Sequence, residues 1–127
     1  MIKIKEVAGL PFISASVTFR GQKTELENVL IDTGSAGTIF NVNKLEHIGV
    51  KPEPNDVTQT ITGVGGLEFV YTKELDQISI AKDIKIKNFL IELGSMEYGL
   101  DLDGIIGYDF MKSVGLNIDL KHFRLTI

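Results

Sequence analysis

Val29-Leu30-Ile31-Asp32-Thr33-Gly34-Ser35-Ala36-Gly37-Thr38-Ile39-Phe40 places one carboxylate between two apolar runs. The residues from Val29 to Ile31 are aliphatic and predict a buried β-strand. The small residues after Asp32, with glycine at 34 and 37, let the backbone turn sharply and approach another group closely. Asp32 therefore stands at the end of a core strand, where an ionised carboxylate is costly unless it is hydrogen-bonded.

An ordinary turn is the alternative interpretation of this stretch. Asp followed by Gly is a common turn pattern, and a four-residue motif such as Asp-Thr-Gly-Ser also occurs by chance. Two features favour a functional aspartate instead. Apolar residues flank the motif on both sides, and a second glycine-bracketed apolar pair, Gly104-Ile105-Ile106-Gly107, follows some seventy residues later.

The two motifs together resemble those of the retropepsin-like (retroviral-type) aspartic proteases. The form Gly-Ile-Ile-Gly-x-Asp-Phe over residues 104–110 is more similar to cellular and bacterial relatives than to the viral enzymes. The resemblance covers nearly the whole chain. It implies an all-β fold, a small closed acid-protease barrel with one or two short helices and a flap hairpin, formed by residues 1–127 as a single domain.

Length and composition agree with a globular protein of one domain. The chain has 127 residues, of which 43% are hydrophobic and 24% charged, and both fractions are ordinary for a soluble domain. The formal net charge of -4 argues against a nucleic-acid partner, which requires a basic face. Because there is no cysteine, a disulfide framework and a thiol nucleophile are excluded.

No membrane, metal or cofactor partner is expected from the sequence. The N-terminus alternates charged and aliphatic residues, unlike a signal peptide, and no apolar run has the length of a membrane span, so we expect a cytoplasmic protein. His47 and His122 lack a second ligand at metal spacing. The stretch Asp101-Leu102-Asp103-Gly104 is only part of a calcium loop.

Alternating polar and apolar residues predict short strands joined by turns. Two short helices are expected, one after Phe40 capped by Asn41 or Asn43 and ended by Gly49, the other over 110–114 capped by Asp109. Residues 58–75 predict a long hairpin with a glycine-rich tip at 63–66, where the spacing and the lack of a following helix disfavour a phosphate loop. The remaining strands are expected over 2–7, 12–19, 24–31, 38–40, 77–81, 84–92, 104–107, 116–120 and 123–127.

Two carboxylates can hydrolyse a peptide bond without a metal or a thiol. One ionised carboxylate takes a proton from water, while the other, protonated, polarises the carbonyl group, and a pair at contact distance shares a single proton. This chain has one Asp-Thr-Gly, so we expect the second carboxylate to be Asp32 of another copy across a two-fold axis. The resemblance implies the same homodimer. Ser35 lacks the Gly-x-Ser-x-Gly context of a serine hydrolase elbow.

The resemblance also implies roles for single residues. Asp32 is the catalytic acid, the Thr33 hydroxyl bonds across the dimer, and Gly34 brings its N–H to the carboxylates. Ser35 is expected to donate to an outer oxygen of Asp32, which would lower the pKa of the pair and favour an acidic optimum. Substrate contacts are expected from Ala36, Ile61, Thr62, Gly63, Val64, Gly65 and Gly66. Support of the Asp32 loop is expected from Gly104, Ile105, Ile106 and Gly107, and a dimer sheet from the terminal strands.

The most favoured function is therefore a homodimeric aspartic endopeptidase that acts on peptides or proteins. One alternative is a module of the same fold that binds peptides or proteins without cleaving them. Another is a monomeric domain that acts only inside a larger assembly. The intact Asp-Thr-Gly favours the enzyme, because a binding groove has no need of an acid at that position.

Overall fold

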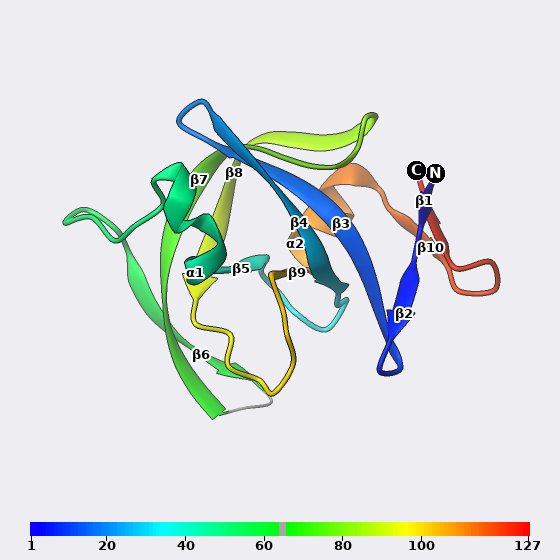
Figure 1. Cartoon of the computed structure of the whole chain (residues 1–127), viewed down its shortest axis with the longest axis horizontal. Coiled ribbons are helices and arrows are strands. Elements are labelled where there is room, and N and C mark those ends of the chain that lie inside the picture. Colours follow the sequence, from blue (N-terminus) through cyan, green and yellow to red (C-terminus); the bar gives the residue numbers. More distant parts are fainter. Residues whose placement is uncertain (64–65) are drawn as a thin grey trace.

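The computed structural model describes residues 1–63 and 66–127, and almost all of its regular structure is β-strand (Figure 1). The elements are β1 (Ile2–Lys3), β2 (Lys5–Val7), β3 (Leu10–Phe19), β4 (Gln22–Ile31), β5 (Ile39–Asn41), α1 (Val42–Leu45), the 3-10 turn η1 (Glu46–Ile48), β6 (Thr58–Gly63), β7 (Gly66–Ala81), β8 (Ile84–Gly94), β9 (Gly104–Ile106), α2 (Tyr108–Val114), β10 (Asn117–Asp119) and β11 (Arg124–Thr126).

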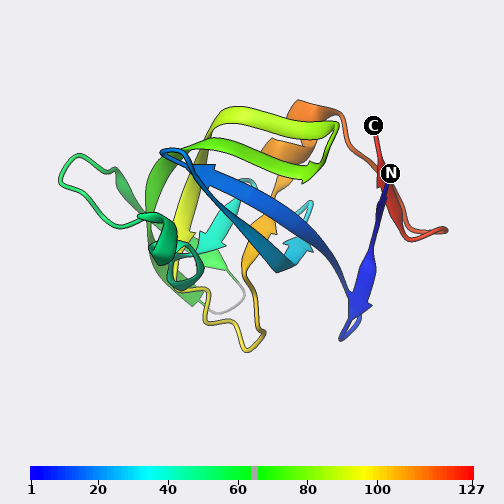
Figure 2. The same cartoon turned by 45° about the horizontal axis from the view of Figure 1, so that its top comes forward.

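The main sheet curls on itself into a ring. Its strand order is β2-β3-β4-β9-β5-β8-β7-β6, and an additional pairing between β3 and β7 joins the two sides. Most neighbours are antiparallel, while β4–β9 and β5–β8 are parallel. Figure 2 shows the curled strands with α2 beside them. The prediction of a mostly β fold with two short helices is confirmed.

The interior of the ring is filled by alternate residues of its long strands. In β3, Ala15, Val17 and Phe19 are buried, and in β4 Leu26, Val29 and Ile31. The spacing of two in β3, and from Val29 to Ile31 in β4, is the geometry of a pleated strand with one face on the core. The step of three from Leu26 to Val29 falls where the register of β3 and β4 shifts. Burial of such apolar side chains is the main stabilising contribution in a domain of this size.

The N-terminal strand expected over 2–7 is divided between two sheets. β1 pairs with β11, which also pairs with β10, while β2 pairs with β3 in the main sheet. Ile4, between them, is buried, and its N–H donates to Phe123 O at 2.7 Å. The small terminal sheet stands beside the ring, and the two chain ends lie next to each other in both views (Figures 1 and 2).

Strand β7 is longer than the sequence predicted. The hairpin strand expected to end at Leu75 continues to Ala81 and pairs in turn with β6, β8 and β3. Asp76 does not break the strand, because its carboxylate accepts from the N–H groups of Arg20 and Gly21 at 3.0 and 2.8 Å in the neighbouring turn. Asp76, which falls between two predicted strands, therefore lies inside one strand and stabilises the turn between β3 and β4.

Of the two expected helix caps, one is present and one is not. The side chain of Asn41 accepts from Asn43 N at 3.0 Å and caps α1. The N-cap of α2 is Gly107, while Asp109 lies inside the first turn, so the prediction that Asp109 caps this helix was wrong. Gly115 ends α2 with φ of 67°, as expected for a left-handed C-cap. Within the described ranges, no helix has the length and hydropathy that crossing a membrane requires.

Candidate active site

Asp32 begins the loop that leaves the end of β4. Its N–H donates to Ile106 O at 3.1 Å, which extends the parallel β4–β9 ladder by one residue. Its carbonyl accepts from Ser35 N at 3.2 Å and closes the turn. The side chain is half-buried, so a rigid strand end presents a carboxylate that solvent still reaches.

Gly34 provides a hydrogen-bond donor to this carboxylate. Its N–H donates to Asp32 Oδ1 at 2.9 Å, which fixes the orientation of the carboxylate relative to the loop. A Cβ at position 34 would lie 3.2 Å from the same oxygen, closer than side chains normally pack. The missing side chain thus allows the backbone to approach the carboxylate, as the sequence indicated. Thr33, Gly34 and Ala36 are all exposed beside Asp32.

Ser35 does not make the bond that the sequence analysis expected. Its hydroxyl donates to Gly37 O at 2.7 Å instead of to Asp32. A serine hydroxyl has one proton to donate, so it stabilises the shape of the loop and not the charge of the aspartate. The expected acidic pH optimum depended on a hydrogen bond from Ser35 to Asp32, so the structure does not support it.

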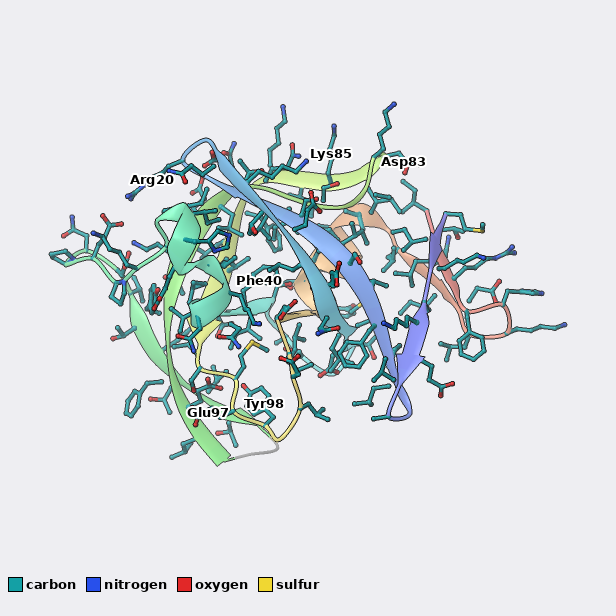
Figure 3. All side chains as sticks on the ribbon, viewed as in Figure 1. Arg20, Phe40, Asp83, Lys85, Glu97 and Tyr98 are labelled. Carbon is teal, nitrogen blue, oxygen red and sulfur yellow. The ribbon has the colours of Figure 1, made fainter. Side chains whose placement is uncertain are left out.

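The Gly104–Gly107 segment lies directly against the Asp32 loop. β9 pairs with β4 on one side and with β5 on the other. A Cβ at Gly107 would fall 2.2 Å from Gly37 O, and one at Gly104 would fall 2.4 Å from the ring of Phe40. Phe40 is fully buried near the centre of the molecule (Figure 3). Both glycines are required by close backbone approach, and Ile105 and Ile106 are buried on opposite sides.

Thr38 and Asp109 connect the two motifs, and the sequence analysis missed this contact. Thr38 is fully buried. Its hydroxyl donates to Asp109 Oδ1 at 2.8 Å and accepts from Gly107 N at 3.1 Å, and its N–H donates to Asp109 Oδ2 at 3.3 Å. Two features of the sequence could have indicated this contact: Thr38 is a polar residue at the start of an apolar strand, and Asp109 is an acid next to the second glycine motif.

Glu92 is a second acid that the sequence did not single out. Its carboxyl oxygen Oε1 lies 2.2 Å from the point that a Cβ at Gly37 would occupy, so the absence of a side chain at 37 makes room for it. Oε2 is buried and has no hydrogen-bond partner among residues 1–63 and 66–127. Burial, followed by the nearby charges of Asp109 and Glu68, raises the pKa of Glu92 above its usual value.

Strands β6 and β7 form the long hairpin that was expected over 58–75. Thr58 pairs with Tyr71 at one end and Gly63 with Gly66 at the other. Thr62 and Gly66 are exposed, and Ile61 is half-buried. Val64 and Gly65, which were expected to contact substrate, lie outside the described residues.

An apolar cluster joins this hairpin to the strands that position Asp32. Leu30 of β4 and Ile105 of β9 lie on the face opposite the main core, and Ile61 and Val70 of the hairpin pack on the same cluster. The other members are Leu10, Phe12, Ile39, Met96, Tyr98 and Leu102. The hairpin therefore covers the sheet face that runs up to the aspartate.

Two of the cavities lined by the described residues lie away from the loop itself. One of about 200 Å³ is lined by Val7, Ala8, Phe12, Asn28, Leu100 and Asp101 and shares Phe12 with the apolar cluster. A larger one of about 560 Å³ lies around Arg20, Glu53 and Lys73 and has no lining residue from the loop of Asp32 or from β9. Among the described residues no group of three or more potential ligands is arranged to hold a metal ion.

Comparison with known proteins agrees with this geometry. A sequence model of a family described as aspartyl protease matches residues 15–110, which include both motifs. No curated protein matches the chain. Among solved structures, the chain is similar to a retropepsin-like aspartic protease from Rickettsia conorii. The two have 19% sequence identity and a TM-score of 0.70 over 99% of this chain and 97% of that chain, a likeness of fold.

Proposed function

The chain belongs to the aspartyl protease family, and from that premise we propose that it is a homodimeric aspartic endopeptidase with Asp32 as its catalytic residue. The observation that carries the proposal is the half-buried carboxylate of Asp32, held at a strand end and bonded by Gly34 N–H. Two glycine-dependent close contacts behind the loop support it, because rigid positioning is what acid–base chemistry needs.

The proposed mechanism requires two copies of the chain. Asp32 of one protomer is ionised and takes a proton from water, while Asp32 of the partner subunit is protonated and donates to the carbonyl oxygen. Water oxygen bonds to the carbonyl carbon, giving a tetrahedral intermediate. Collapse of this intermediate breaks the C–N bond and re-forms a C=O bond: one carboxyl gives its proton to the leaving amine, while the other, ionised, takes the proton of one hydroxyl of the intermediate. The two carboxyls share one proton throughout, since like charges at contact distance do not both ionise.

We assign the dimer interface to the loop of Asp32 and to the terminal sheet. The exposed Thr33 lies beside the catalytic residue and is assigned the cross-dimer hydrogen bond. Exposed apolar side chains flank the strands of the terminal sheet, namely Met1, Leu120, Phe123 and Ile127. Such side chains favour burial against a second copy.

The peptide groove is assigned to the space between the β6–β7 hairpin and the face of β4 and β9. Leu30 and Ile61, half-buried members of the apolar cluster, support a preference for apolar substrate side chains next to the cleaved bond. Ala36, the hairpin residues 61–66 and the backbone of the Asp32 loop are the proposed peptide contacts. The hairpin is the proposed flap, which closes over the substrate and excludes water. Two further expectations remain predictions: that residues 1–127 act as one domain, and that the protein is cytoplasmic.

The decisive experiment compares the wild type with Asp32→Asn in a peptide-library digest from pH 3 to 7. Asparagine keeps the size of the side chain but does not accept the proton from water. We expect cleavage by the wild type and a loss of about a thousandfold or more in the variant. Sedimentation of both proteins, run in parallel, is expected to give dimers.

The alternatives give different results in the same experiment. Full activity of Asp32→Asn would reject the assignment of the catalytic residue. Peptide binding without cleavage by the wild type across the pH range would indicate the binding module. A monomer in sedimentation at micromolar concentration, without cleavage, would indicate a domain that acts only inside an assembly.

A further inference from the structure

Glu68 of β7 accepts hydrogen bonds from a segment almost thirty residues further along the chain. Met96 N–H donates to Glu68 Oε1 at 2.9 Å, the hydroxyl of Ser95 donates to the same oxygen at 3.3 Å, and the hydroxyl of Tyr98 donates to Oε2. All three donors belong to the segment 95–98, which follows β8 and has no regular structure. One carboxylate thus joins the hairpin to the start of the 95–103 loop.

The backbone of this segment is shaped around the carboxylate. A Cβ at Gly94 would lie 2.5 Å from Glu68 Oε1 and 3.2 Å from Val70 Cγ1, so a side chain there would displace Glu68. Met96 has φ of 54°, a left-handed conformation that L-residues with long side chains rarely adopt. Its N–H is one of the donors to Glu68. The absence of a side chain at Gly94 and the left-handed backbone of Met96 both occur at the contact with Glu68. Together they indicate a specific structural link.

Tyr98 brings this link to the apolar cluster beside the catalytic loop. Its ring is half-buried and packs on the cluster that contains Leu30, Ile61 and Ile105. Burial, and then the hydrogen bond with Glu68, raise the pKa of the Tyr98 phenol, so the hydroxyl keeps the proton that it donates. Figure 3 shows Tyr98 and Glu97 on the 95–103 loop near the end of the hairpin.

We propose that Glu68 and Tyr98 form a clasp that makes the β6–β7 hairpin and the segment 95–98 move as one body, which sets the width of the peptide groove. Glu68 is a positioning residue, because it acts through Tyr98 and the segment and does not touch Asp32. The clasp itself rests on the hydrogen bonds described above. Its effect on peptide binding rests on the proposed function.

The first test measures the clasp without using activity. Amide hydrogen exchange is followed by mass spectrometry in peptides that cover 67–70 and 94–99. In Glu68→Ala and in Tyr98→Phe we expect exchange in both segments to rise together, by several-fold to about tenfold. Glu68→Gln is expected to be intermediate, since its amide oxygen still accepts from Met96 N–H and Ser95.

The matched control is Glu97→Gln, which removes one negative charge from an exposed position of the same segment. We expect its exchange to equal that of the wild type in both regions. A rise in only one of the two regions in Tyr98→Phe, or no rise in either, would overturn the clasp. Tyr98→Phe keeps the ring in the apolar cluster, so this outcome does not depend on whether Glu68→Ala folds.

The second test separates binding from chemistry with an extended peptide substrate. Loss of the clasp is expected to raise KM about tenfold while kcat stays within about twofold of the wild-type value. A fall in kcat with KM unchanged would overturn the positioning role, because it would place Glu68 in the chemical step. Coupled exchange in a protein that cleaves no peptide would mean that the clasp holds and the proposed function fails.

Discussion

At the scale of single residues, acids in this chain differ by the groups that face them. Asp32 is half-buried with an N–H donor at 2.9 Å. Glu92 lies behind the same loop, and one of its oxygens is buried and has no hydrogen-bond partner in the part of the chain that the structure describes. Burial raises the pKa of Glu92 above its usual value, so the environment of this carboxyl favours its neutral form.

Glu92 leads to a prediction about the pH dependence of stability. Its pKa is raised above 4.5 in the folded protein, so the folded chain binds the proton more tightly than the unfolded chain. Stability is therefore greatest at low pH for this group and falls as pH rises from about 4.5 through the folded value. Glu92→Gln, which resembles the protonated form, is expected to unfold at a higher temperature than the wild type at pH 7.

Thermal unfolding from pH 3 to 8 measures this effect. The difference between Glu92→Gln and wild type is expected to be largest at pH 7 and to disappear below about pH 4.5, where both side chains are neutral. The control is Glu97→Gln, which makes the same substitution at an exposed position. A difference that is constant over the whole range would show that burial does not control this carboxyl.

At the scale of elements, the hairpin is attached to the rest of the fold at its base as well as near its tip. Lys73 of β7 has only 5% of its side chain exposed and pairs with Glu53 and with Asp56, the latter at 2.8 Å. Arg20 of the β3–β4 turn pairs with Glu53 at 2.8 Å. Thr72 N–H donates to Val57 O at 3.0 Å. The loop before β6 is thus bound to the strand that leaves the hairpin.

Lys73→Met is expected to loosen this base and to lower stability in a pH-dependent way. The hydrogen bond from Lys73, followed by that from Arg20, lowers the pKa of Glu53 from 4.5 to about 2, and the bond from Lys73 also lowers the pKa of Asp56. Stability from these carboxylates is present above about pH 4.5 and is lost as pH falls toward 2. Urea unfolding should therefore separate wild type and variant most at pH 7 and least near pH 2.

A suitable control for Lys73→Met is Lys82→Met, in the exposed turn between β7 and β8. It removes the same charge from the turn that follows β7, and we expect no pH-dependent loss of stability. Equal destabilisation by both variants would mean that net charge, and not the ion cluster, determines the effect.

At the scale of the whole molecule, one Asp-Thr-Gly in a chain of 127 residues leaves the proposed site incomplete without a second copy. Wild type and Asp32→Asn chains, when allowed to exchange, should form mixed dimers with a single aspartate. If both aspartates are required, activity falls as the square of the wild-type fraction. In an equimolar mixture about a quarter of the dimers keep two aspartates.

Peptidase activity at constant total chain concentration measures this prediction. Activity near a quarter of the wild-type value at equal amounts supports a site shared by two chains. Activity of half would mean that each chain works alone. A mixture with Ser113→Ala, a substitution at an exposed position of α2, serves as the control and is expected to keep full activity.

The sequence by itself determined the class of fold, the Asp32 turn, the long hairpin and both short helices. These features depend on contacts between near neighbours. Alternation of polar and apolar residues fixes which face of a strand is buried, and glycine fixes where the backbone turns or approaches another group closely. The roles expected for Gly34 and Gly107 came in addition from the resemblance to the retropepsin-like proteases.

Only the tertiary structure decided which distant groups meet. Strand β7 continued past Asp76 because a turn more than fifty residues away supplied its hydrogen bonds. Asp109 bonds with Thr38 and Glu68 with Tyr98, at separations of 71 and 30 residues. Such pairs depend on strand register and ring closure, since a shift of one residue would turn every side chain to the opposite face. That register is set by the packing of the whole sheet, which no short stretch of sequence contains.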